Sequence, residues 1–125
     1  MFILLAALVA ALALAEADVA QERFNAFLQD TQLSTDLAEK AEPTLQCMAK
    51  GAASLDKAKP KADKAEAKTA YAELERKCGM AEATSKAALE ISAKFKDFTD
   101  VEAAGVADAY FRQLIFFGAL AYSGK

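Results

Sequence analysis

Alanine occupies 31 of the 125 positions, and this abundance restricts the possible fold more than any other feature of the chain. Alanine, glutamate, lysine, glutamine and leucine are the best helix formers, and the only two prolines are Pro43 and Pro60. No segment shows the alternating pattern of a half-buried strand. The sequence therefore predicts an all-α protein: a small antiparallel helical bundle of four to six helices.

The chain begins with an uninterrupted apolar run over residues 2–15. A helix of this length covers roughly 21 Å, which is short of the roughly 30 Å of a bilayer core. The run ends in Ala15-Glu16-Ala17, a small-x-small sequence of the kind that signal peptidase accepts, although no lysine or arginine precedes it. We expect a signal peptide rather than a retained membrane anchor.

Cleavage after Ala17 leaves residues 18–125 as the mature chain, and cleavage after Ala15 is the competing possibility. The mature chain is long enough for one domain with a modest core. The expected location is secreted, in the extracellular space.

Charge and composition exclude several classes of function. Of the 18 acidic residues one, Glu16, lies in the signal peptide, whereas all 15 basic residues lie in the mature chain, whose formal charge is therefore near −2. This balance predicts no nucleic-acid partner. The absence of histidine and of any glycine-rich loop argues against an enzyme, a metal site or a cofactor.

Helix boundaries follow from the apolar spacing and from capping residues. The first helix is expected over 19–31, and Ser34 and Thr35 offer caps for the next one. Pro43 either lies in the first turn of a new helix or kinks a longer one. A turn is predicted at 57–61, which contains Pro60.

The second half of the chain carries clearer signals. Gly79 is predicted to end a helix in the left-handed conformation. The next helix carries an apolar stripe that continues through Phe98, and Thr99 with Glu102 forms a capping box for the last helix. We expect that helix to bury one set of residues: Val101, Ala104, Phe111, Leu114, Ile115 and Gly118.

The only two cysteines, Cys47 and Cys78, are predicted to form one structural disulfide. A helical hairpin turning near 57–61 brings them to about the same level, within roughly one helical turn. A redox pair would need Cys-x-x-Cys spacing, and a zinc site would need further ligands. Free or intermolecular thiols are the remaining alternative.

Asp108 and Arg112 stand four residues apart in the most apolar helix and can form an ion pair. In one interpretation they belong to a narrow solvent-facing stripe. In the other they form a partly buried pair, in which Arg112 orients the polar head of a ligand or a partner's carboxylate.

The run Leu114–Tyr122 is apolar on nearly every side. It could be a central core helix, line a ligand cavity, form a dimer seam or insert into lipid. Phe116 and Phe117 point about 100° apart, so a single flat neighbour cannot bury both rings. If a cavity exists, its predicted lining comprises Phe95, Phe98, Phe111, Arg112, Leu114, Ile115 and Phe117.

Three functions are compatible with these features. The leading hypothesis is a secreted, non-enzymatic helical bundle that binds a hydrophobic small molecule or lipid between its helices. The alternative is a secreted protein–protein interaction or structural module, with a homodimer through the C-terminal helix as one form. A membrane-active protein ranks third, because such proteins usually carry a basic polar face.

Overall fold

The structure is a computed structural model that describes residues 18–58 and 64–123. The described residues form helices joined by short connections and include no strand. The predicted all-α bundle is therefore confirmed. The predicted signal peptide over 1–17 lies outside the described residues, as does most of the turn predicted at 57–61.

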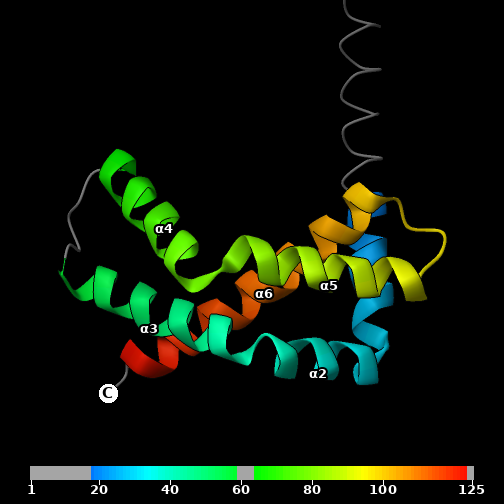
Figure 1. Ribbon diagram of the computed structural model, residues 1–125, viewed down its shortest axis with the longest axis horizontal. Helices are drawn as coiled ribbons and strands as arrows, with labels where there is room; N and C mark the ends of the chain where they lie inside the picture. Colours follow the sequence, from blue (N-terminus) through cyan, green and yellow to red (C-terminus); the bar gives the residue numbers. More distant parts are fainter. Residues whose placement is uncertain (1–17, 59–63, 124–125) are drawn as a thin grey trace, which may run out of the picture.

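Six helices make up the described part of the chain. An N-terminal helix covers residues 18–29 and stands across the others (Figure 1). Helices α2 and α3 follow one another end to end in nearly the same direction, and α4 and α5 then run back along them, so that α4 lies antiparallel to α3. The last helix, α6, packs against both α3 and α5. The bounds are α2 Thr31–Lys40, α3 Glu42–Ala58, α4 Lys64–Cys78, α5 Met80–Lys94 and α6 Asp100–Ser123.

The cap of α2 differs from the prediction. Asp30 is the N-cap, and its carboxylate accepts a hydrogen bond from the backbone N–H of Leu33 at 3.0 Å. Ser34 and Thr35, which were expected to be caps, lie inside α2, and the Ser34 hydroxyl donates to the carbonyl of Thr31. The first helix therefore ends at residue 29, because the backbone leaves the helical conformation at Asp30.

Other boundaries agree with the prediction. Pro43 lies in the first turn of α3, where its missing N–H leaves no intrahelical bond unmade. Gly79 separates α4 from α5 with φ of +74°. Thr99 and Glu102 exchange both bonds of the capping box at the start of α6, at 2.8 and 3.1 Å. The helix α5, however, ends at Lys94. Phe95 and Phe98, which were expected on its apolar stripe, therefore lie in the connection to α6.

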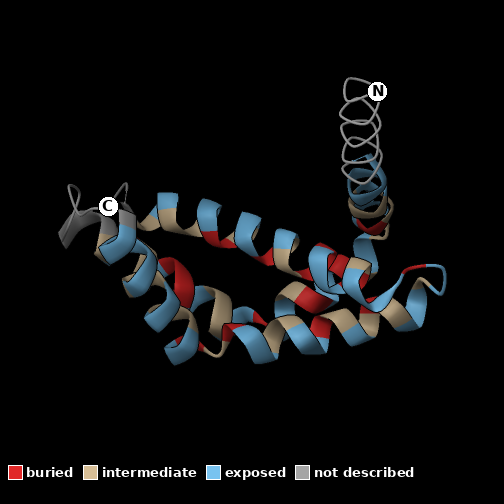
Figure 2. Ribbon diagram, turned by 90° about the horizontal axis from the view of Figure 1, so that it is seen from above, coloured by how far each residue is buried: buried red, intermediate tan, exposed pale blue. Residues whose placement is uncertain are grey.

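Buried residues from all six described helices form one core (Figure 2). Its largest fully buried members come from helices far apart in the sequence: Phe27, Leu37, Met48, Ile91 and Phe111. Phe27 and Tyr110 pack edge to face with ring centroids 5.1 Å apart, and the Tyr110 hydroxyl donates to the carbonyl of Ser34. Through these two interactions, Tyr110 of α6 contacts both the N-terminal helix and α2.

The buried face of α6 was predicted only in part. Phe111 and Ile115 are buried as expected, whereas Leu114 and Gly118 are half-buried. Val101 is 82% exposed and Ala104 is exposed, so the prediction was wrong for both. The buried residues of the first turns are instead Ala103, Val106 and Ala107.

A change of neighbours along α6 explains this difference. Val106 and Ile115 are nine residues apart, which places them about 180° apart around the helix, and both are buried. The buried side of α6 therefore turns along its length, whereas the prediction assumed one straight stripe.

Two glycine substitutions should change stability in opposite directions. Gly79→Ala forces a Cβ into the left-handed region and should lower the free energy of unfolding by about 1 kcal/mol. Gly105→Ala lies within α6, where an added Cβ meets no atom within 4 Å, and should raise that free energy by roughly 0.5–1 kcal/mol.

Urea unfolding of the oxidised protein measures both changes. Gly79→Asn is the control, because asparagine tolerates the left-handed conformation and should lose less stability than alanine. Equal stability of the wild type and Gly79→Ala would contradict the assignment of this residue as a required joint between α4 and α5.

Candidate ligand groove

A groove of about 390 Å³ opens between α3, α4 and the C-terminal half of α6. We call it the ligand groove. Its polar lining residues are Glu66 and Arg112, and the remainder of the wall is mostly apolar. Small side chains provide most of the space, because four of the lining residues are alanines. The apolar wall comprises Ala52, Leu55, Ala67, Ala70, Tyr71, Ile115, Phe116 and Ala119.

Close helix contacts border this groove. A Cβ at Gly51 would overlap the side chain of Leu74, so the Leu74 side chain of α4 packs directly on the α3 backbone there. A Cβ at Gly118 would come within 3.0 Å of the Cβ of Ala49, so α3 and α6 approach closely at that point. The groove therefore lies beside positions where glycine allows tight packing between the helices.

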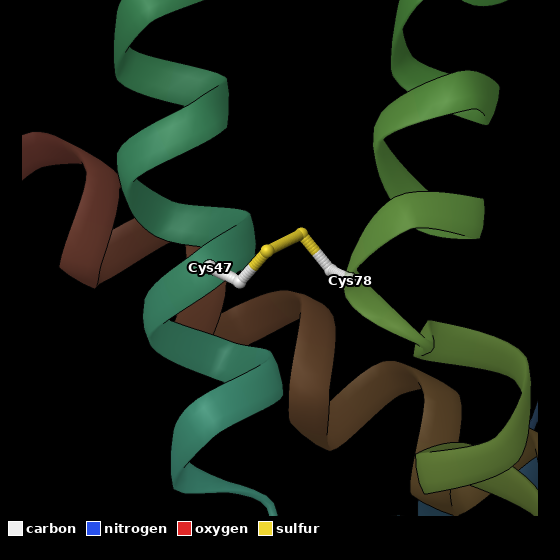
Figure 3. Close-up of a disulfide and its surroundings, with 2 residues drawn as sticks. All are labelled: Cys47 and Cys78. Carbon is white, nitrogen blue, oxygen red and sulfur yellow. A yellow bond between two sulfur atoms is a disulfide. The ribbon is translucent and has the colours of Figure 1, made fainter.

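A disulfide joins Cys47 of α3 to Cys78 of α4, as predicted (Figure 3). The two Cα atoms are 5.6 Å apart, within the usual range for a disulfide. By the chain-entropy estimate, a bridge closing a loop of this length contributes roughly 3–4 kcal/mol to stability. It holds the C-terminal end of α4, the helix that supplies one wall of the groove.

Arg112 lies at one end of the groove with two carboxylate partners. Its Nε donates to Asp108 at 2.8 Å, which confirms the predicted pair, and its terminal NH2 group donates to Glu75 of α4 at 2.8 Å. The side chain of Arg112 is 45% exposed, so these ion pairs contribute little to stability. Their effect is to fix the guanidinium between α6 and α4.

The electrostatics at this end of the groove follow from these contacts. Hydrogen bonds to Asp108 and Glu75 raise the pKa of Arg112. Burial raises the pKa of the neighbouring Tyr71 phenol, an effect that Arg112 opposes and Glu75 and Asp108 reinforce. At neutral pH the phenol is therefore protonated and available as a hydrogen-bond donor.

Arg112 also lines a second, more polar depression of about 700 Å³ between α4, α5 and α6. We call it the polar hollow. Its charged lining residues are Glu75, Arg76, Glu82, Asp108 and Arg112. Arg112 thus stands where an apolar groove meets a charged hollow, an arrangement suited to a molecule with an apolar tail and a polar head.

The structure brings only two of the predicted lining residues to the ligand groove, Arg112 and Ile115. Phe111 is buried in the core, Leu114 borders a different depression beside Ala49 and Gly118, and Phe117 is 59% exposed. Phe95 and Phe98 stack on each other at 4.7 Å in the connection before α6, and Arg23 lies 5.0 Å above the Phe98 ring.

Sequence reasoning missed most of the groove, including all four alanines and Tyr71, and it also missed Glu75 of the polar hollow. Alanine occurs on every face of these helices, so no periodic signal distinguishes an alanine that borders empty space from one at a tight contact. Glu75 lies on a different helix from Arg112, and only the tertiary fold reveals their pairing.

In the part of the chain that the structure describes, no cluster of three or more acidic, cysteine or histidine side chains is placed to bind a metal ion. Among the side chains that the structure describes, every buried nitrogen and oxygen has a hydrogen-bond partner.

No helix among the described residues combines the length and hydrophobicity needed to cross a membrane.

The chain matches no protein-family model, and no curated protein or solved structure shows significant similarity to it. Functional inference therefore depends on the geometry of the groove and its surroundings.

Proposed function

We propose that this protein is a secreted, non-enzymatic helical protein that binds a hydrophobic small molecule or a lipid chain in the ligand groove. The observation that carries the proposal is a mostly apolar groove of about 390 Å³ whose only charged lining residues, among those the structure describes, are Glu66 and Arg112. That volume falls at the lower end of the range typical of small-ligand pockets, about 300–1,000 Å³.

The dimensions of the groove limit the ligand. Arg112 and Ala119 mark two positions along α6 that are seven residues, about 10 Å, apart. The groove therefore suits a single short alkyl chain of roughly eight methylenes, whose burial is favourable by about 0.8 kcal/mol for each methylene.

Secretion is supported by the apolar segment that ends in Ala15-Glu16-Ala17 and by the disulfide, a bond that persists in oxidising compartments. We expect a secreting host to release a chain that starts at Asp18 and has both cysteines oxidised. Intact mass spectrometry of the protein from the medium measures both features. A chain that stays in the cell with residues 1–17 attached would contradict secretion.

A substitution that fills the groove should abolish ligand binding. Ala67 lines the groove from α4 and is exposed, so Ala67→Phe should occupy the space without disturbing the core. We expect this variant to bind the neutral fluorescent dye N-phenyl-1-naphthylamine, and the fatty alcohols that displace it, at least tenfold more weakly than the wild type does. Mass spectrometry of lipids extracted from the purified wild type tests for a natural ligand.

Ala65→Phe is the matched control, because Ala65 is an exposed alanine two residues away, about 200° around the same helix. It should bind as the wild type does. If the wild type contains no lipid and displaces no dye at concentrations up to about 1 mM, the proposed function is wrong.

A second candidate function is protein–protein interaction, possible through the C-terminal half of α6. Phe116, Phe117 and Leu120 are 60, 59 and 53% exposed, and they project within about 100° of one another around the helix. We call these three residues the C-terminal patch. Exposed apolar clusters of this kind often mark interaction sites, so a homodimer sealed by this patch is the natural form of the alternative.

Sedimentation velocity tests the homodimer. If it forms, the wild type should sediment faster as its concentration rises through the micromolar range, and the double variant Phe117→Ser/Leu120→Ser should remain monomeric. This pair spares Phe116, which also lines the ligand groove. A wild type that stays monomeric at every concentration excludes the tight homodimer and leaves ligand binding unaffected.

A further inference from the structure

The polar end of the ligand groove is acidic, although its most prominent side chain is an arginine. Glu75 and Asp108 each bind the guanidinium of Arg112 at 2.8 Å, so these three groups together carry one negative charge. The side chains of Glu75 and Asp108 are 26 and 43% exposed. Both carboxylates are therefore accessible to a ligand as well as to the arginine.

The remaining charges of the polar hollow do not reverse this balance. Arg76 binds Glu73, and Glu82 lies 3.2 Å from Lys86. Of the side chains that line the hollow, three are carboxylates and two are guanidiniums, and both guanidiniums are ion-paired. A negatively charged head group would add a further anion to a site whose cations already have partners.

We propose that the ligand groove selects a single-chain amphiphile with a positively charged head group, such as an alkylammonium ion. The alkyl chain lies along the alanines of the groove, and the ammonium lies in the polar hollow between Glu75 and Asp108. This inference rests on the proposed function, because it names the class of ligand for the same groove.

Geometry supports the division between tail and head. Arg112 lines both the groove and the hollow, and Glu75 and Asp108, which bind its guanidinium, line the hollow, so the two carboxylates lie next to the Arg112 end of the groove. An ammonium there hydrogen-bonds to charged acceptors, which gives shorter and stronger bonds than neutral acceptors do. A carboxylate head could still contact unused N–H groups of Arg112, but Glu75 and Asp108 would repel it.

Three probes with the same alkyl chain separate these possibilities: decylammonium, decanol and decanoate. Each is titrated at pH 7 and low salt, below its micelle concentration, against the full mature protein with its disulfide intact. Displacement of the neutral dye reports binding. We expect decylammonium to bind most tightly, decanol less tightly and decanoate least, with roughly 3–10-fold between the first and the last.

Removing the carboxylates should reverse the order. In the double variant Glu75→Gln/Asp108→Asn, Arg112 becomes an unpaired cation, and decanoate should bind more tightly than decylammonium. Glu73→Gln is the control, because Glu73 lies on the same helix, is exposed and binds Arg76 instead. This control should retain the wild-type order, and circular dichroism should show that all variants are folded.

Each outcome decides one point. Equal affinities, or tightest binding of decanoate to the wild type, would overturn the inference and leave the proposed ligand-binding function standing. An unchanged order in the double variant would also overturn it. Failure of all three probes to bind would refute the ligand groove itself, and with it both the inference and the proposed function.

Discussion

The Cys47–Cys78 disulfide is the interaction on which the proposed site depends most. Among the described residues of α4 only Cys78 is buried, while Tyr71 and Leu74 are partly buried against the core. Leu74 also contacts Gly51, and Glu75 forms an ion pair with Arg112. Without the disulfide, the fold would lose roughly 3–4 kcal/mol of stability. The loss would fall on α4, the helix with little other burial to hold it in place.

Small side chains have two opposite effects in this fold. At Gly51 and Gly118 they leave room for the side chains of Leu74 and Ala49, whereas at Ala67, Ala70 and Ala119 they border unfilled space. The difference lies in what faces each residue. Where a glycine faces a larger side chain or a near backbone, packing is tight; where alanines from three helices face one another, none is long enough to fill the gap.

Much of the fold could be predicted from local signals. The left-handed glycine at Gly79, the Thr99–Glu102 capping box and the pairing of the two cysteines all depend on nearby residues or on a single hairpin. The predictions were wrong or incomplete where contacts between helices decide which residues are buried or paired. Val101 is apolar and correctly spaced, yet no described residue covers it, and the pairing of Glu75 with Arg112 requires two helices to meet. The groove was the least predictable feature, because it is a space between alanines.

The position of the disulfide within α4 has a mechanical consequence. Cys78 is the last residue of the helix, and the left-handed Gly79 follows it at once, so the covalent anchor and the backbone joint lie at the same point. The contacts described for α4, through Leu74, Glu75 and Cys78, are concentrated near this same end. The 15 residues of α4 extend about 21 Å from Cys78, so a rotation of about 10° about that end would displace the far end by roughly 4 Å. Such a rotation would change the width of the groove far more than the packing around Phe111.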